Sequence, residues 1–437
     1  MRRWKLAAAG TMAALLAAGC SSSASGSGSG GGGSGPVTIT IWHNYGTEQN
    51  ATALKNLATA FEKLHPNIKI NVVSQDASNY FAQLQSAAIS KNGPDLAVMW
   101  TGLFTLQYKS FLTNLKTELP ASALARIDPN ALKWSSDGFN PNNASYVIPL
   151  ENQFYIGFYN KADFAKAGVT SVPTDWSQLY AACTKLKKAG FTPIVYGNGG
   201  QPLGATFYPW YDMSYMMIGA HSLAQWKGLY DGSIKWTAQS NLAQLKRWHS
   251  LYTSGCTNKD VLTKTNNMQD FEKGKAAMMV DGTWDTAQYT STMKSNVAAF
   301  VPPFSTTPIK GVVEYPGDGF SVMKYSQHQK EAFKFLDFMT TRAAGNIINA
   351  AGLIPDIAGM STSNPVNQQM LNFVNVQHMT PYPMLDNYIQ VNVVNAGSKV
   401  LPAVLAGQQS ALSAMKNMAQ AWQQLPANQR SSKSFNG

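Results

Sequence analysis

The chain has 437 residues, of which 44% are hydrophobic and 11% aromatic. This is enough apolar surface for a large core in more than one domain, so the composition excludes an intrinsically disordered protein. The formal net charge is +11, but lysine and arginine are scattered along the chain, which argues against a nucleic-acid-binding surface. Only 13% of the residues are charged, so the surface must be rich in uncharged polar side chains, which suits contact with neutral polar molecules.

The N-terminus has the pattern of a signal peptide. Basic residues precede an apolar stretch over residues 7–18 that is too short to cross a bilayer comfortably. Gly19 and Cys20 follow this stretch, and the whole segment resembles the signal of a bacterial lipoprotein, in which a cysteine after small residues is acylated. Ala17 departs from the leucine that such signals prefer, so plain cleavage and secretion is the alternative. We expect a signal over residues 1–20 that ends at a lipidated Cys20, and therefore a protein anchored on the extracytoplasmic face of the bacterial cell membrane.

Strands and helices alternate after a flexible segment. Residues 21–36 are almost all serine and glycine, which cannot bury apolar surface, so they are predicted to form a tether. Apolar residues then alternate along 37–41 and 68–72, which predicts strands, while helical spacing follows each of these strands. The apolar run from Leu96 to Trp100 is short enough for a buried parallel strand.

The same alternation resumes after Tyr146. We expect a strand over residues 155–159, a helix with Thr174 as its N-cap, and a strand over residues 193–196. Repeated strand and helix units predict an α/β fold, and two groups of such units predict two lobes. No later stretch has about 18 consecutive apolar residues, so no membrane span is expected after the signal.

Two cysteines remain if Cys20 is lipidated. Cys183 continues the apolar stripe of one predicted helix, and Cys256 follows another over residues 242–252. Their spacing matches no CxxC redox or zinc pattern. Outside the cell such a pair favours a disulfide, with two unconnected buried thiols as the alternative.

Short segments spread over the chain from Val37 onward match one family in their order and spacing. They are ITIWH at 39–43, FEKLHPNIKI at 61–70, GPDL at 93–96, YVIP at 146–149, FYNK at 158–161, PTDW at 173–176, FEKGKAAM at 271–278, DGTW at 281–284 and GDGF at 317–320. Each segment is weak alone. Together they resemble the extracellular solute-binding protein family 1, the maltose-type sugar-binding lipoproteins of ATP-driven importers.

The resemblance implies a fold, a partner and a mode of action. It implies an α/β, two-lobed periplasmic-binding-protein-like fold of type II, with the ligand in the cleft and three chain crossings between the lobes. Lobe 1 would comprise residues 37–149 and 312–355, and lobe 2 residues 150–311 and 356–437. The protein would be a monomer that binds a mono- or oligosaccharide by lobe closure and delivers it to the permease of an ABC importer. It would not be an enzyme and would need no cofactor or metal.

Aromatic and amide side chains mark the candidate sugar-binding loops, because a sugar presents an apolar face and planar rows of hydroxyls. Trp284 matches the family's stacking tryptophan, with core packing as the alternative, and Asp285 adjoins it. Trp42, His43 and Tyr45 follow the first strand, at the carboxyl edge where such sheets present ligands. His43 could equally be a loop histidine.

Further candidates lie at a strand end and at the crossover between the lobes. Trp100 and Thr101 lie at the end of the strand that begins after Asp95. For Asp95 itself a structural role is favoured. Glu151, Asn152 and Gln153 lie at the crossover, where a carboxylate or amide can bind two adjacent hydroxyls. Glu151 could instead be a hinge or surface acid. Looser matches add Tyr208, Trp210, Asp318 and Asp386.

Two other functions stay open. An anchored glycan hydrolase would need two carboxylates such as Glu151 and Asp285, but the sequence gives no distance between them. No HExxH, Gly-x-Ser-x-Gly or Walker motif accompanies them. A polyamine or other cationic ligand would need an acid-rich cleft, whereas the candidate loops are mainly aromatic and amide.

Overall fold

The computed structural model describes residues 35–431, apart from 47–48, 78, 136–143 and 198–203. The predicted signal, its Cys20 and nearly all of the tether lie outside the described residues. Residues Pro36–Gly437 make up one compact unit. Within its described part, no helix combines the length and the apolar character that a bilayer crossing requires.

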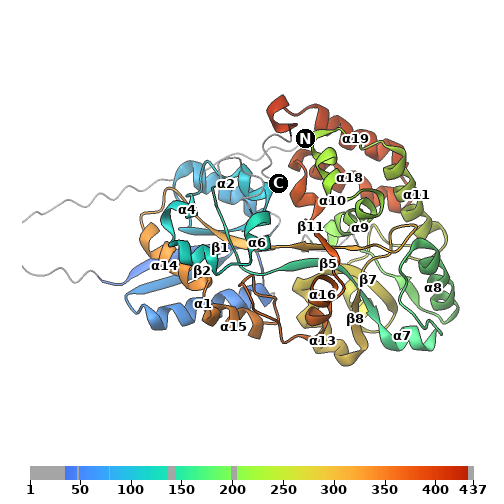
Figure 1. Ribbon diagram of the computed structural model, residues 1–437, viewed down its shortest axis with the longest axis horizontal. Coiled ribbons are helices and arrows are strands. Elements are labelled where there is room, and N and C mark those ends of the chain that lie inside the picture. Colours follow the sequence, from blue (N-terminus) through green and yellow to red (C-terminus); the bar gives the residue numbers. More distant parts are fainter. Residues whose placement is uncertain (1–34, 47–48, 78, 136–143, 198–203, 432–437) are drawn as a thin grey trace, which may run out of the picture. The chain divides into compact units, whose positions relative to one another are not determined.

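The first sheet has the strand order β2-β1-β3-β10-β4 and is mixed (Figure 1). Its strands are β1 (Val37–His43), β2 (Ile68–Ser74), β3 (Leu96–Trp100), β4 (Ile148–Pro149) and β10 (Asp318–Val322). β1 is parallel to β2 and β3, as predicted for the buried run that forms β3. β10 comes from far later in the chain and lies antiparallel between β3 and β4.

Helices cover this sheet with apolar faces at the predicted spacing. On α1, Leu54, Leu57 and Phe61 are buried against the core of the first sheet, because helical spacing places them on one side. The helices of this part are α1 (Gln49–Leu64), α2 (Tyr80–Ser90), α3 (Leu103–Gln107), α4 (Leu115–Glu118), α5 (Ala121–Ala125), α6 (Pro129–Ser135), α14 (Gln329–Met339) and α15 (Arg342–Ala350).

The second sheet is centred on β5, which is antiparallel to β7, β8 and β9. Parallel pairs extend it from β7 to β6 and from β9 to β11. Its strands are β5 (Gln153–Asn160), β6 (Thr192–Ile194), β7 (Ala276–Gly282), β8 (Val297–Phe300), β9 (Gly311–Tyr315) and β11 (Thr380–Tyr382). Phe154, Ile156 and Phe158 face one core and Tyr155 faces another, so β5 is apolar on both sides.

The helices around the second sheet include one whose start differs from the prediction. They are α7 (Lys161–Lys166), α8 (Trp176–Lys188), α9 (Gly204–Ala220), α10 (Leu223–Asp231), α11 (Gln239–Thr253), α12 (Asn267–Glu272), α13 (Thr286–Met293), α16 (Pro365–Asn375), α17 (Leu385–Tyr388), α18 (Val391–Leu405) and α19 (Ala411–Gln423). The N-cap of α8 is Asp175 and not Thr174. The Asp175 carboxylate accepts the Gln178 backbone N–H at 2.9 Å, whereas the Thr174 hydroxyl donates to the Gln178 side chain.

The chain passes between the two sheets three times. The first passage, at residues 150–152, joins β4 to β5, and the third follows α15 at residues 353–356. The second passage joins β9, which pairs within the second sheet, to β10, which pairs within the first. This passage therefore falls after Tyr315, and not at residues 311–312, where the boundary between the lobes was expected. Gly317 turns the chain there with a φ of +57°, and a β-carbon at this position would collide with the Gln153 side chain.

Carboxyl groups gather where these passages meet. Asp356 is 2% exposed, and neither of its carboxyl oxygens has a hydrogen-bond partner among the described residues. Burial raises the pKa of Asp356 well above its ordinary value of 3.8, and the negative charges of Asp128, Glu151 and Glu314 raise it further. Burial likewise raises the pKa of Glu314 to about 7. Asp356 is therefore a buried carboxyl group whose proton binds more tightly in the folded state than in the unfolded chain.

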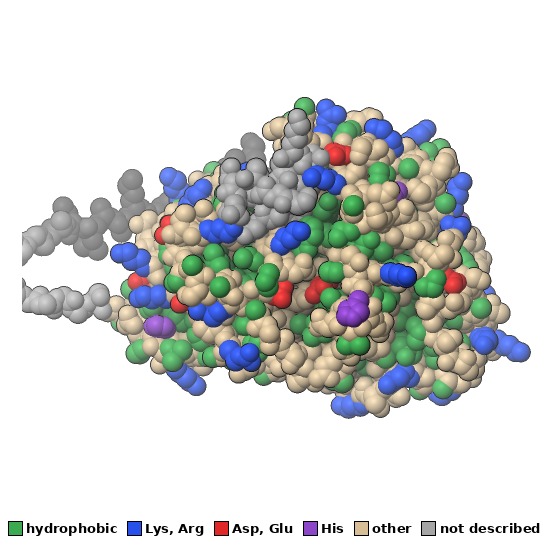
Figure 2. Space-filling view, viewed as in Figure 1, with side chains coloured by type: hydrophobic (Ala, Val, Ile, Leu, Met, Phe, Trp, Pro, Cys, Tyr) green, Lys and Arg blue, Asp and Glu red, His purple; other side chains and the backbone are tan. Residues whose placement is uncertain are grey.

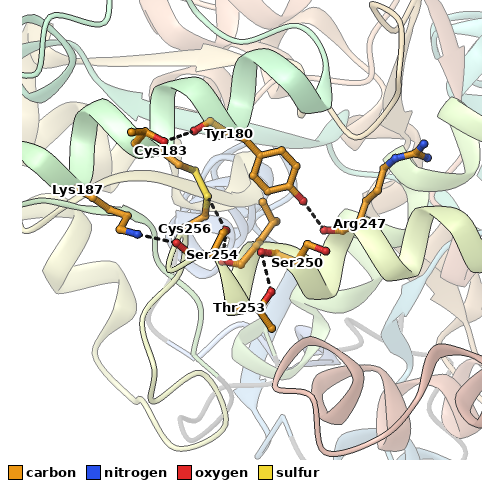
Figure 3. The surroundings of a disulfide bond; sticks show 10 residues. Tyr180, Cys183, Lys187, Arg247, Ser250, Thr253, Ser254 and Cys256 are labelled. Atoms are coloured by element: carbon orange, nitrogen blue, oxygen red, sulfur yellow. Dashed lines mark hydrogen bonds between the residues drawn. A yellow bond between two sulfur atoms is a disulfide. The ribbon is translucent and has the colours of Figure 1, made fainter.

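The predicted disulfide is present, between Cys183 on α8 and Cys256 just after α11, with their Cα atoms 5.3 Å apart (Figure 3). Both cysteines are buried. Two hydrogen bonds join the same helices: the Tyr180 hydroxyl donates to the Arg247 carbonyl at 2.7 Å, and the Lys187 ammonium donates to the Ser254 carbonyl at 2.6 Å. The bridge thus connects two elements of the second lobe.

Candidate ligand-binding site

A cavity of about 440 Å³ is lined by residues from both sheets and from the passages between them. This volume lies in the range of about 300–1,000 Å³ that is typical of small-molecule sites. From the first sheet, Asn44 and Tyr45 follow β1, while Trp100 and Asp318 lie opposite each other on β3 and β10. The carboxyl ends of the parallel strands β1 and β3 therefore contribute to the cavity, as parallel α/β sheets usually do.

Trp284, Tyr155 and Tyr211 form an aromatic wall on the side of the second sheet. The Trp284 ring centroid lies 6.0 Å from that of Tyr155 and 5.8 Å from that of Tyr211, and the two tyrosine rings are 4.3 Å apart. Trp284 lies in the 3-10 turn after β7 and is half-buried. A β-carbon at Gly282 would collide with the indole, so glycine at this position lets the ring lie against the backbone.

Tyr196 and Tyr208 form a second aromatic pair, and Tyr196 is hydrogen-bonded to the buried Asp212. The two tyrosine rings are 4.9 Å apart and both line the cavity. Asp212 accepts hydrogen bonds from the Tyr196 hydroxyl at 2.6 Å and the Trp248 indole at 2.7 Å, and burial raises the pKa of Asp212 to about 7. The Tyr208 hydroxyl is buried, and it has no hydrogen-bond partner in the described part of the chain. It is therefore a polar group that a ligand could satisfy.

Two amides are oriented by Glu151 at the first passage. Glu151 is fully buried and does not line the cavity. One of its oxygens accepts hydrogen bonds from the Gln153 amide at 2.8 Å and from the Asn50 amide. Because both NH₂ groups point at the carboxylate, the carbonyl of Asn50 is directed elsewhere, and it has no partner among the described residues. Glu151 therefore acts on the cavity by positioning two side chains that line it.

Four aspartates line the cavity: Asp281, Asp285, Asp318 and Asp386. The Tyr155 hydroxyl donates to Asp386 at 3.0 Å, and the Tyr289 hydroxyl donates to Asp281. Burial raises the pKa of Asp281 and of Asp386 to about 6.

No lysine, arginine or histidine is among the described lining residues. No group of histidine, cysteine, aspartate or glutamate in the described chain is arranged to hold a metal ion.

The sequence-based candidates separate into two sets. Those that line the cavity are Tyr45, Trp100, Gln153, Tyr208, Trp284, Asp285, Asp318 and Asp386. Those that do not are Trp42, His43, Thr101, Glu151, Asn152 and Trp210. Ligand contact stays a prediction for the first set, and the second set contributes through packing or hydrogen bonds.

Each member of the second set has a partner that accounts for its position. His43 is buried, its Nδ1 accepts the Tyr45 N–H at 3.2 Å, and burial lowers its pKa. The Thr101 hydroxyl donates to the Gly317 carbonyl at 2.7 Å. Asn152 donates to Glu314, and Trp42 packs against the core of the first sheet. Trp210 is fully buried and donates to the Ser398 hydroxyl at 2.8 Å.

Several lining residues were not predicted from the sequence. They include Asn50, Tyr155, Tyr196, Tyr211, Asp281 and Tyr315. Tyr155 and Tyr315 lie within apolar strands and read as core residues, and Asn50 lies in the first turn of α1. Asp281 belongs to the DGTW segment, so that segment was the one signal that could have identified it.

A cavity formed by two α/β lobes that are joined by three passages is the architecture of two-lobed solute-binding proteins. The chain belongs to the bacterial extracellular solute-binding protein family, whose family model matches residues 45–346. This confirms the family that the sequence segments indicated.

Known proteins similar to the chain agree with this assignment. An uncharacterised ABC transporter extracellular-binding protein of Pyrococcus horikoshii is 27% identical over 329 residues, which cover 72% of this chain and 71% of the relative. The multiple sugar-binding protein of Streptococcus mutans is 25% identical over 312 residues, 69% of this chain and 71% of the relative. The solved structure of a chitin oligosaccharide binding protein matches with a TM-score of 0.77 at 20% identity, over 88% of this chain and 98% of that one, which supports the fold.

Proposed function

We propose that this protein is the carbohydrate receptor of an ABC importer. It binds a mono- or oligosaccharide in the cavity between its lobes and delivers it to a membrane permease, which works with its own ATPase. The observation that carries the proposal is the lining of the cavity, which combines an aromatic wall with oriented amide and carboxylate groups.

This lining suits the chemistry of a sugar. The C–H face of a pyranose ring packs on an aromatic ring, for which Trp284 and Trp100 are available. Its hydroxyls need planar groups that accept and donate hydrogen bonds, which Asn50, Gln153 and the Tyr208 hydroxyl supply. The multiple sugar-binding protein of Streptococcus mutans supports the same ligand class by its name.

Lobe closure supplies the signal to the permease. A ligand that contacts both lobes binds the closed arrangement more tightly than the open one, so it shifts the population toward closure. Residues from both lobes line the cavity here, including Trp100 on β3 and Trp284 after β7. The receptor acts as a monomer on the extracytoplasmic face, attached through Cys20.

A hydrolase receives less support from the geometry. Glu151, half of the carboxylate pair that such an enzyme would need, is fully buried and does not line the cavity. No described observation favours turnover over binding.

Isothermal titration of the purified chain, without residues 1–20, against a panel of mono- and oligosaccharides tests the proposal. We expect at least one saccharide to bind, and small-angle X-ray scattering to record a smaller radius of gyration in its presence. Release of shorter sugars during the titration would favour the hydrolase. The absence of binding across the panel would refute the carbohydrate assignment.

A further inference from the structure

The charge inside the cavity is opposite to the charge of the whole protein. The chain has 34 lysines and arginines against 23 aspartates and glutamates. On the face in Figure 2, the basic side chains are spread over the surface. The described cavity lining has four aspartates and no basic residue. In a cavity with apolar walls the field of these carboxylates is concentrated, so the site attracts positive charge.

Asp386 lies at the aromatic wall. Its carboxylate oxygens accept the Tyr155 hydroxyl at 3.0 and 3.2 Å, and the Tyr155 ring contacts Tyr211 and Trp284. A carboxylate beside a cluster of aromatic rings matches the two requirements of an organic cation, which are an opposite charge and aromatic groups. Asp386 is 6% exposed, so a cation there would be screened little by solvent.

Unpartnered polar groups in the same cavity point to a ligand with hydroxyls as well as a charge. Tyr208 and Asn50 both line the cavity, and both are more than nine-tenths buried. Neither the Tyr208 hydroxyl nor the Asn50 carbonyl has a hydrogen-bond partner among the described residues. A protonated linear polyamine can donate to the Asn50 carbonyl but carries no acceptor for the Tyr208 O–H, whereas the hydroxyls of a saccharide can donate to the carbonyl and accept from the O–H.

We propose that the preferred ligand is a saccharide that carries a protonated amine, with the ammonium bound at Asp386 against the Tyr155, Tyr211 and Trp284 wall. This inference rests on the proposed carbohydrate receptor and names its substrate class. It also reverses an expectation, because the acid-rich cleft that a cationic ligand requires is formed by aspartates from separate segments of the chain.

The test compares matched ligands. Each neutral saccharide of the panel is titrated beside its 2-amino-2-deoxy counterpart at neutral pH, with spermidine as a cation that is not a sugar. We expect the amino form of the best saccharide to bind at least about tenfold more tightly than the hydroxy form, because a charge-assisted hydrogen bond is roughly twice as strong as a neutral one.

A variant then locates the charge. Asp386→Asn keeps an acceptor for the Tyr155 hydroxyl and removes the negative charge, so the ratio of the affinities for the amino and hydroxy forms, both measured on the variant, should fall from at least about tenfold to about one. Glu118→Gln removes one exposed carboxylate outside the cavity and should leave the preference intact.

The outcomes separate the two proposals. Equal or tighter binding of the hydroxy form would overturn the amino-sugar inference and leave the carbohydrate receptor standing. An unchanged preference for the amino form in Asp386→Asn would overturn the placement of the ammonium at Asp386. Binding of spermidine alone, or of no ligand in the panel, would overturn both.

Discussion

Trp284 reaches the cavity because of its neighbours in the chain. Gly282 leaves space for the indole, and the 3-10 turn Thr283–Asp285 directs the side chain toward Tyr155 and Tyr211. Its half-buried position allows the ring to contact a ligand while the rest of its surface packs on the second lobe.

Trp284→Ala should therefore weaken saccharide binding at least tenfold, because loss of a central aromatic contact costs about 2 kcal/mol or more. Titration calorimetry gives the affinity, and a thermal melt of the unliganded protein should change little. Trp422→Ala removes the same side chain from α19, away from the cavity, and should leave affinity unchanged. Affinity within twofold of the wild type in Trp284→Ala would place the sugar elsewhere in the cavity.

The candidate site could be predicted only where a residue type signals its role. Trp100 was a candidate because it ends a predicted strand, and Trp284 and Asp318 were candidates because they match positions of the family that the sequence resembles. Tyr155 has the same pattern as a core tyrosine, and only the tertiary structure brings Asp386 to its hydroxyl, 231 residues away. Three of the four lining aspartates, Asp285, Asp318 and Asp386, were candidates from the sequence, but only the tertiary structure brings them into one cavity with Asp281.

At the scale of elements, local patterns predicted the strands and helices that depend on local periodicity. β1, β2, β3 and the helices between them lie where alternation and helical spacing indicate. The insertion of β10 between β3 and β4 was not predictable, because its partners are distant in sequence and its own apolar run is short. The N-cap of α8 was missed by one residue, since Thr174 and Asp175 are both good capping residues.

The disulfide between Cys183 on α8 and Cys256 just after α11 should stabilise the second lobe without affecting ligand binding. It closes a loop of 73 residues, for which the loop-entropy model gives about 4 kcal/mol. The double variant Cys183→Ala, Cys256→Ala should therefore lose about 2–4 kcal/mol in urea unfolding followed by circular dichroism. Its saccharide affinity should match the wild type, because neither cysteine lines the cavity. Equal unfolding midpoints for the two proteins would contradict this prediction.

At the scale of the whole molecule, buried acids set the pH dependence of stability. Asp356, Glu314 and Asp212 have pKa values raised by burial, so the folded state holds their protons at pH values where the unfolded chain has released them. At these three groups the unfolded state then binds fewer protons, so their contribution to the free energy of unfolding falls as pH rises above about 4.

Asp356→Asn should remove one of these contributions. Between about pH 4 and the raised pKa of the folded carboxyl, the wild type should lose about 1.4 kcal/mol per pH unit more than the variant, which is the slope for one proton. Urea unfolding at pH 4, 5, 6 and 7 measures the difference. Parallel curves for the two proteins would mean that Asp356 titrates as in the unfolded chain.

The proposed attachment to the membrane rests on Cys20, which precedes the folded unit in the sequence. If Cys20 is lipidated, mass spectrometry of the protein extracted from membranes should find an acylated N-terminal cysteine. Cys20→Ser should then release the receptor from the membrane fraction while its saccharide affinity is retained. An unmodified N-terminus that begins at another residue would favour plain cleavage and secretion, which the Ala17 position keeps open.

The half-buried position of Trp284 also gives the receptor an optical reporter. The chain has 11 tryptophans, but Trp210, Trp226 and Trp248 are fully buried and their emission is shielded from a soluble quencher such as iodide. A sugar ring that covers Trp284 would shield its indole in the same way, so the quenched fraction of the fluorescence should fall as the cavity fills. The difference in quenched fraction between the wild type and Trp284→Phe isolates this signal. It would report occupancy of the cavity by the sugar in solution, within the time of one mixing experiment and without an attached dye.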